Sequence, residues 1–228
     1  MDFIIISVGN ELLCGDTQNT NATYMAKKLT QFGHYVRRVI VVPDDVDEIA
    51  MEVSRAREMA DFVLVTGGLG VTHDDVTAEG VAKAFRRKLE LNDEAVETMR
   101  GRVTNEEAIR KMAMLPEGSE VIKNDVGAAP GFIVENVAVM PGVPKEMENI
   151  FEKIVPRFGV TNYYEEKVRV EGFEDRIADK LEVVVSEFPD VSVGSYPKPG
   201  YIIVKFSGKN KKSVMSAKRR FMELAGLA

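Results

Sequence analysis

The 228-residue sequence contains no tryptophan, one cysteine and two histidines, and these shortages exclude several classes of protein. A single cysteine, Cys14, cannot form an intramolecular disulfide, and no Cys and His cluster has the spacing of a zinc site. We therefore expect a protein of the reducing cytoplasm. The apolar stretch over residues 1–8 is too short to span a bilayer and lacks the basic start of a signal sequence, so no membrane segment is predicted.

Positive charge is also scarce. The 30 Lys and Arg residues are outnumbered by 36 Asp and Glu residues, which gives a net charge of -6 and argues against a nucleic-acid binder. The one basic cluster, within residues 209–220, has the spacing of a solvated loop and helix face. The expected partner is a small molecule, not a nucleic acid or a membrane.

Alternating strand and helix patterns dominate the first part of the chain. Continuous apolar runs predict strands at residues 3–8, 35–42 and 61–65, and helical spacing predicts helices at residues 22–32, 46–59 and 76–87. This order is typical of a parallel sheet with right-handed crossovers. Two short helices broken near Gly101 are expected next, then short strands at residues 120–122, 131–134 and 137–140, and a helix from residue 144 to about 155.

Residues 156–161 have the composition of a linker, and the pattern beyond them changes to strand, helix, strand, strand, helix. We therefore predict an α/β domain at residues 1–158 and a small α+β domain at residues 159–228. A small domain built from so few short elements has a small core and is expected to pack against a neighbouring surface. We therefore expect a homo-oligomer, preferably a dimer. The proline-containing loop at residues 195–200 is either a plain structural turn or a segment that reaches a pocket of another subunit.

A glycine-rich turn at residues 66–77 follows the third predicted strand and precedes a helix. Backbone N–H groups and the positive helix end converge at such a turn, which makes it a typical phosphate site. The ligand-binding candidates in this turn are Thr66, Gly67, Gly68, Gly70, Thr72 and Thr77.

Four polar or glycine-rich loops each follow a predicted strand, at residues 9–21, 43–45, 66–77 and 141–145. The carboxyl ends of parallel strands share one rim, where ligands bind, so these loops are expected to face a single pocket. The rim adds the ligand-binding candidates Gly9, Asn10, Pro141, Gly142, Val143 and Lys145.

The rim is acidic, and a polyphosphate would be repelled from it unless a cation neutralised the carboxylates. Hard oxygen ligands suit Mg²⁺ or Mn²⁺, and the paired Asp74 and Asp75 are the predicted metal ligands. Asp44 has a simpler alternative as a helix cap, and Lys145 can either contact a phosphate or pair with glutamates on its own helix. His73 is either an acid–base group or a bystander in the loop.

Four motifs in register resemble the competence/damage-inducible CinA family, at residues 9–13, 66–77, 127–132 and 141–147. The resemblance implies a three-layer α/β fold of the Mog-like molybdopterin-binding type with a mostly parallel sheet, followed by a small middle domain. It also implies roles for Asp44 and Asp75, which match acidic positions important for molybdopterin adenylylation and metal insertion in molybdenum-cofactor enzymes of this fold.

In CinA proteins this domain is associated with metal-dependent ADP-ribose pyrophosphatase activity. The leading expectation is therefore a hydrolase of a nucleoside diphosphate sugar that uses Mg²⁺, Mn²⁺ or Co²⁺, with Asp44, Asp75 and Glu11 as catalytic candidates. The alternative is a pterin-nucleotide binding protein, with molybdopterin as ligand and without hydrolase activity. The chain departs from the family at Val71, where proline is usual, and at Asn19, often aspartate. It ends at Ala228, so the amidase activity of longer members is not expected.

Overall fold

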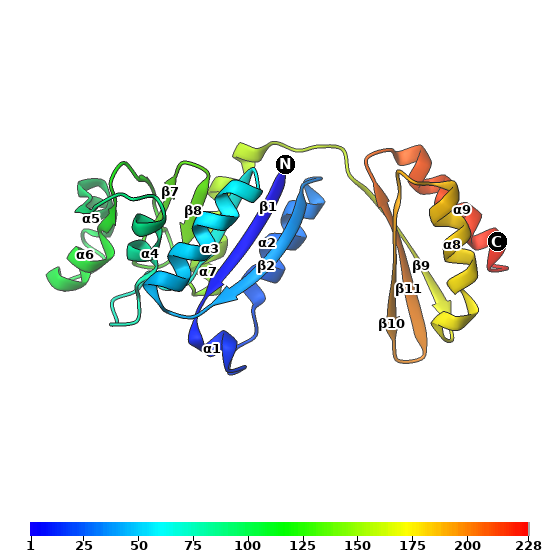
Figure 1. Ribbon diagram of the computed structural model, residues 1–228, viewed down its shortest axis with the longest axis horizontal. Helices are drawn as coiled ribbons and strands as arrows, with labels where there is room; N and C mark the ends of the chain where they lie inside the picture. Colours follow the sequence, from blue (N-terminus) through cyan, green and yellow to red (C-terminus); the bar gives the residue numbers. More distant parts are fainter. Residues whose placement is uncertain (228) are drawn as a thin grey trace. The chain divides into compact units, whose positions relative to one another are not determined.

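The computed structural model describes residues 1–227, and the chain divides into two compact units (Figure 1). The first unit contains Met1–Thr30 and His34–Gly159, and the second contains Gln31–Gly33 and the chain from Val160 onward. Each unit has its own hydrophobic core.

A six-stranded sheet with the order β2-β1-β3-β8-β7-β6 forms the centre of the first unit. Its parallel strands are β1 (Asp2–Val8), β2 (Tyr35–Val42), β3 (Phe62–Thr66) and β8 (Val137–Met140). The antiparallel strands β7 (Gly131–Val134) and β6 (Glu120–Ile122) complete one edge. Residues 3–8 of β1 are all buried, as expected for a central strand covered on both faces. The mostly parallel sheet predicted from the sequence is confirmed.

Helices cover both faces of this sheet and make the predicted three layers (Figure 1). Ile4 and Ile6 of β1 share a core with α3 (Val46–Met59) and α4 (Thr77–Ala84). The other two long helices, α2 (Thr20–Gln31) and α7 (Pro144–Ile154), meet through an edge-on contact between Tyr24 and Phe151. The central strands β1, β3 and β8 need cover on both sides because nearly all their side chains are buried, whereas the edge strand β2 is partly exposed.

Short elements that the sequence did not predict lie beside the expected ones. They are the helix α1 (Asn10–Leu13) and the paired strands β4 (Leu89–Leu91) and β5 (Met114–Pro116). The two helices expected around Gly101 are present as α5 (Asp93–Met99) and α6 (Glu106–Met112). These segments lack the apolar and β-branched runs by which the equally short strands β6, β7 and β8 were predicted.

The prediction of a linker at residues 156–161 is wrong for residues 156–158. Val155–Phe158 forms a 3₁₀ helix, η1, and Val155 is buried. The ring of Phe158 packs edge-on against Phe3 and Phe62, with centroid separations of 4.8 Å in both contacts. This segment therefore belongs to the core of the first unit.

The second unit is a small α+β domain, as predicted. Its antiparallel sheet has the order β10-β11-β9, formed by β9 (Tyr164–Glu171), β10 (Ser192–Lys198) and β11 (Tyr201–Gly208). The helices are η2 (Glu174–Arg176), α8 (Ala178–Glu187) and α9 (Lys211–Leu224). Most of the loop expected at residues 195–200 is strand, because Ser195 to Lys198 pair with β11.

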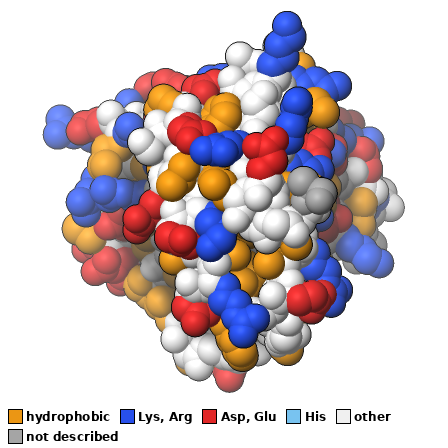
Figure 2. All heavy atoms as spheres, turned by 90° about the vertical axis from the view of Figure 1, so that its right-hand side faces the viewer, with side chains coloured by type: hydrophobic (Ala, Val, Ile, Leu, Met, Phe, Trp, Pro, Cys, Tyr) orange, Lys and Arg blue, Asp and Glu red, His pale blue; other side chains and the backbone are white. Residues whose placement is uncertain are grey.

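Acidic and basic side chains are interspersed with apolar ones on the face shown in Figure 2, and no broad field of one sign is present there. This mixture fits the expectation that the basic residues near the C-terminus are a solvated surface. Among residues 1–227, no helix has both the length and the apolar character needed to cross a membrane.

Candidate functional site

The backbone of the glycine turn between β3 and α4 lies very close to neighbouring residues. Gly67 and Gly68 have φ values of 110° and 64°, which disfavour any residue with a side chain. A Cβ on Gly67 would lie 2.1 Å from the carbonyl oxygen of Val8, and one on Gly68 would lie 2.2 Å from Oγ1 of Thr77. Only glycine fits at these two positions, so the two glycines of this turn have a direct steric cause.

Asp75 folds back onto the turn instead of capping α4. Its Oδ2 accepts hydrogen bonds from the backbone N–H of Thr72 at 2.8 Å and from the Thr72 hydroxyl at 2.7 Å. The same oxygen lies 2.6 Å from where a Cβ on Gly70 would be. The N-cap of α4 is Val76, which has no capping side chain. Asp75 therefore stabilises the turn that carries it.

Asp74 lies on the outer side of the same turn. It accepts a hydrogen bond from the Thr72 hydroxyl, which together with the nearby charges of His73 and Lys111 holds the pKa of Asp74 below its ordinary value. Lys111 of α6 also donates to the carbonyl oxygen of Thr72. The two aspartates thus share the single hydroxyl hydrogen of Thr72, and Lys111 ties α6 to their loop.

A large pocket of about 520 Å³ opens beside the turn. Its walls are mostly apolar, and its two acidic residues are Asp75 and Glu146. The pocket is lined by Gly68, Leu69, Gly70, Val71, Asp75, Val103, Ala108, Met112, Ala128, Ala129, Pro141, Gly142, Val143 and Glu146. It therefore joins the glycine turn, the loop before α7 and the helix α6.

Glu146 in the first turn of α7 is a site residue that sequence reasoning missed. Its Oε2 accepts a hydrogen bond of 2.6 Å from Nδ2 of Asn124, and its carboxylate lies against Gly127. In the sequence, Glu146 entered only as one of the glutamates with which Lys145 can pair if Lys145 does not contact a phosphate. The available signal was the glycine at position 127, which leaves room for a carboxylate.

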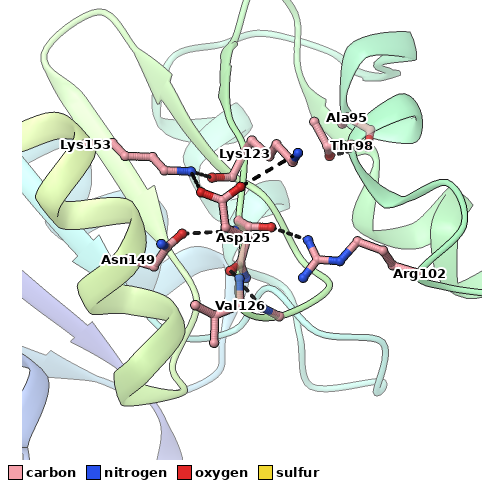
Figure 3. A network of polar contacts seen from close by, with 10 residues as sticks. Ala95, Thr98, Arg102, Lys123, Asp125, Val126, Asn149 and Lys153 are labelled. Atoms are coloured by element: carbon pink, nitrogen blue, oxygen red, sulfur yellow. Dashed lines mark hydrogen bonds and ion pairs between the residues drawn. The ribbon is translucent and has the colours of Figure 1, made fainter.

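A polar network holds the segment that contacts Glu146 (Figure 3). Arg102 donates to the carbonyl oxygen of Asn124, and the backbone N–H of Asp125 donates to Oδ1 of Asn149 at 3.0 Å. The ammonium group of Lys153 pairs with the Asp125 carboxylate and, with help from Lys123, keeps the pKa of Asp125 below its ordinary value. These contacts tie the segment at residues 123–126, which precedes the pocket-lining Ala128 and Ala129, to α7 and to the loop after α5.

A small pocket of about 70 Å³ lies on the other side of the turn. It is lined by Ser7, Val8, Glu11, Leu12, Thr17, Gln18, Asn19, Thr20, Asn21, Thr66, Gly67, Gly142 and Pro144. Gly142 lines both pockets, while the adjacent glycines 67 and 68 each line one of them. The sequence predicted a single pocket along this rim. The structure instead has two pockets, which meet at Gly67, Gly68 and Gly142.

Several predicted residues lie outside both pockets. Asp44 accepts a hydrogen bond of 2.8 Å from the backbone N–H of Asn10, and α3 is capped by Asp45. The interpretation of Asp44 as the cap of α3 is therefore wrong; it holds the start of α1. Gly9 and Lys145 also lie outside the two pockets.

The two threonine hydroxyls expected to bind ligand are used differently. The Thr72 hydroxyl is engaged by the two aspartates, and Thr77 is fully buried beneath Gly68. Neither residue lines either pocket, whereas Thr66, Gly67 and Gly70 do. The turn therefore presents chiefly glycine backbone to the two pockets, and the side chains of Thr72 and Thr77 do not line them.

No group of three or more His, Cys, Asp and Glu side chains with metal-binding geometry occurs among residues 1–227. The adjacent Asp74 and Asp75 are consistent with a hard divalent cation, which often uses one or two carboxylates together with phosphate oxygens of the substrate. Of the pair, only Asp75 lines the large pocket.

Residues 4–159 match the family described as "Probable molybdopterin binding domain". The chain belongs to this family. Residues 162–226 match the middle domain of FAD synthase. The molybdopterin-binding domain family match confirms the Mog-like fold for the part of the chain that contains both pockets.

Several relatives align with most of this chain. A protein of Archaeoglobus fulgidus is 63% identical over 224 residues, which are 98% of each chain. A protein of Pyrococcus horikoshii is 40% identical over 213 residues, or 85% of this chain and 83% of its own. The crystal structure of CinA from Thermoplasma acidophilum, a protein of unknown function, is similar with 38% identity and a TM-score of 0.66; the match covers 70% of this chain and all of that one. The CinA resemblance is thus confirmed.

Proposed function

We propose that the first unit binds a phosphate-bearing heterocyclic compound and hydrolyses the diphosphate bond of a nucleoside diphosphate sugar such as ADP-ribose. One observation carries this proposal: the glycine turn and Asp75 open directly into a large pocket with apolar walls. Backbone N–H groups suit the phosphates, and apolar walls suit a flat ring.

The heterocycle fits the large pocket by size and by chemistry. About 520 Å³ lies within the range of roughly 300–1,000 Å³ that is usual for small-molecule sites. Val71, Val103 and Met112 provide apolar surface for the faces of a ring. Glu146 offers a carboxylate to an amino group on its edge, since an ionised carboxylate accepts hydrogen bonds only.

The phosphates then lie on Gly68 and Gly70, next to the Asp75 carboxylate. A divalent cation, held by Asp75 with Asp74 beside it, would neutralise this charge, act as a Lewis acid on the phosphorus and lower the pKa of the attacking water. Water adds to one phosphorus and the bridging P–O bond breaks, so ADP-ribose gives AMP and ribose 5-phosphate. Asp44 supports this arrangement indirectly by holding α1, the helix that carries Glu11.

The test is hydrolysis of ADP-ribose by the purified protein with Mg²⁺, Mn²⁺ or Co²⁺, followed by chromatography of AMP. Asp75→Asn should abolish turnover because it removes the carboxylate that would hold the divalent cation beside the phosphates. Asp16→Asn is the control, since Asp16 is an exposed carboxylate outside both pockets. Absence of AMP from the wild type with all three metals, or unchanged turnover in Asp75→Asn, would refute the hydrolase assignment.

A second candidate is a pterin-nucleotide binding protein without hydrolase activity. The position of Glu146 favours it, because the amino-pyrimidine edge of a pterin presents adjacent N–H donors that one carboxylate can accept. Calorimetric titration with molybdopterin and with ADP-ribose separates the two candidates. Binding of molybdopterin alone, with no heat from ADP-ribose, would favour this second function.

A further inference from the structure

The helix α6 lies between two cavities. Its residues Ala108 and Met112 line the large pocket. A second cavity of about 270 Å³ is lined by Leu91, Val96, Glu106, Glu107, Ile109 and Arg110. With about 3.6 residues per turn, the α6 residues of the two cavities fall on opposite faces of the helix. This helix is therefore a thin wall with open space on both sides.

Open space on both sides leaves α6 with few atoms to pack against. Protein interiors are close-packed, and a side chain that borders a void loses the dispersion contacts that would hold it in place. Of the seven residues of α6, only Ile109 and Met112 are buried. In the loop before the helix, no described atom other than those of its chain neighbours lies within 4 Å of where a Cβ on Gly101 would be. A segment with so little packing opens at a lower cost in free energy than the core does.

Two cationic side chains hold this segment against the other walls of the large pocket. Arg102, in the loop before α6, donates to the carbonyl oxygen of Asn124 (Figure 3). Lys111 of α6 donates to the carbonyl oxygen of Thr72. Asn124 belongs to the segment that contacts Glu146, and Thr72 belongs to the glycine turn. The two hydrogen bonds thus cross from α6 and its loop to two different walls of the pocket.

The base of this hairpin is fixed, which locates the movable part. Strands β4 and β5 pair on either side of it, and the backbone N–H of Asn92 donates to the carbonyl oxygen of Ala113 at 2.9 Å. The buried Ala95 and Met99 anchor α5. Gly101 follows α5 with a φ of 74°, in a region that glycine adopts freely. Movement therefore falls on α6 and on the loop around Gly101, since hinges are a few residues that absorb a change in dihedral angles.

We propose that α6 is a gate of the large pocket, which Arg102 and Lys111 hold closed. When the two hydrogen bonds break, α6 tilts into the space of the second cavity, and Ala108 and Met112 leave the pocket wall. Lids that admit a ligand and then exclude water commonly move in this way. The gate controls access to the pocket for any compound that fits it, so it goes beyond the proposed function and does not depend on hydrolysis.

Hydrogen exchange of the full chain, measured without ligand, tests the gate. Arg102→Gln and Lys111→Gln each remove one hydrogen bond from a charged donor and should speed exchange of the α6 amides about tenfold. In the double variant the two factors should multiply, because both hydrogen bonds hold one moving element. Arg100→Gln is the matched control, since Arg100 forms an exposed ion pair with Glu97 of α5 and should leave this exchange unchanged. Unchanged exchange of α6 in Arg102→Gln would overturn the gate, because its contact would then act only locally.

A thiol in the pocket wall measures access directly. Met112 is 8% exposed, and Met112→Cys is made in a Cys14→Ser background because Cys14 is the one native cysteine and is exposed. Labelling by a small aromatic disulfide reagent should be slow and should become about tenfold faster when Arg102→Gln is added. Met25→Cys, at a fully buried position in α2, is the control for global unfolding, and its labelling rate should not change. Equal acceleration at both positions would show general destabilisation and overturn the gate.

Discussion

The carboxylate of Glu146 occupies the space that a side chain on Gly127 would need. A Cβ on Gly127 would lie 1.9 Å from the carboxyl carbon of Glu146 and 2.0 Å from Oε2. The same oxygen accepts the 2.6 Å hydrogen bond from Asn124. One missing side chain thus allows an acidic group to sit in the wall of the large pocket.

We predict that Gly127→Ala displaces Glu146 and weakens the binding of a heterocyclic ligand. The cost in stability should be about 1 kcal/mol, because the clash falls on the end of a side chain that can move, and overpacking costs about 1–3 kcal/mol when it cannot. Thermal unfolding and calorimetric titration measure the two effects. In a Glu146→Ala background the added methyl should cost almost nothing, and an unchanged cost there would show that the strain lies elsewhere.

Alanine substitutions at two glycines with positive φ distinguish the cost of backbone strain from the cost of a steric clash. Gly68 has φ 64° and would bring a Cβ to 2.2 Å from Oγ1 of the fully buried Thr77. Gly15 has φ 83° but nothing within 4 Å of such a Cβ. Gly15→Ala should cost about 1 kcal/mol for the left-handed conformation, and Gly68→Ala should cost roughly 1–3 kcal/mol more.

Urea unfolding of the two variants gives this difference directly. In the double variant Gly68→Ala with Thr77→Ala, part of the loss should be recovered, because the hydroxyl that meets the new methyl is absent. Equal destabilisation by the two single substitutions would mean that Thr77 does not constrain the glycine turn.

The longer elements of the first unit follow from sequence because their patterns repeat. Residues 3–8 of β1 form an apolar run that is buried along its whole length. The four buried residues of α3 lie on one face, with the spacing that the sequence pattern predicted for a helix. The sequence offered Asp44 as a helix cap, whereas Asp45 caps α3; both residues precede the helix, so the pattern alone does not decide between them. The choice depends on Asn10, whose backbone N–H binds Asp44 from 34 residues away.

The site was predicted less completely than the fold. Gly67, Gly70 and Asp75 belong to one continuous motif, and all three line a pocket. Glu146 was missed because its position depends on Asn124 and Gly127, which reach it only through tertiary packing. The division of the rim into two pockets also depends on how close Gly142 comes to the glycine turn, which spacing along the chain does not encode.

Tyr24 should report the packing of α2 against α7 through its titration. Burial and a 2.7 Å hydrogen bond to Glu152 raise the pKa of Tyr24 to about 12, from an ordinary value near 10. Because the folded pKa is the higher one, this contribution to stability is fully present below pH 10. It is lost as pH rises through about 12.

Tyrosinate absorbance in an alkaline titration, recorded as wild type minus Tyr24→Phe, isolates this group from the other tyrosines. Circular dichroism recorded in parallel establishes the pH range over which the protein stays folded. Glu152→Gln should shift the midpoint down, since it removes the charge that disfavours tyrosinate. A difference signal with a midpoint near the ordinary value would contradict the contact of this hydroxyl with Glu152.

The first unit should fold and bind ligand without the second, provided that the chain extends through Gly159. Both pockets are lined only by residues between Ser7 and Glu146. Phe158 packs on Phe3 and Phe62, and the carbonyl oxygen of Gly159 lies 3.0 Å from Nε2 of His34, so these last residues complete the core. A fragment of residues 1–159 should unfold cooperatively and keep the affinity of the full chain for ADP-ribose.

A fragment of residues 1–155 is the matched comparison. It removes Phe158, a half-buried ring that packs on the buried Phe3, and should lose about 2 kcal/mol, less than the roughly 3–5 kcal/mol usual for a fully buried aromatic side chain. Urea unfolding followed by circular dichroism measures both fragments, and calorimetry measures their affinity. Equal stability of the two fragments would show that the 3₁₀ helix is not part of the core. Loss of binding in the stable fragment of residues 1–159 would instead mean that the second unit contributes to the site.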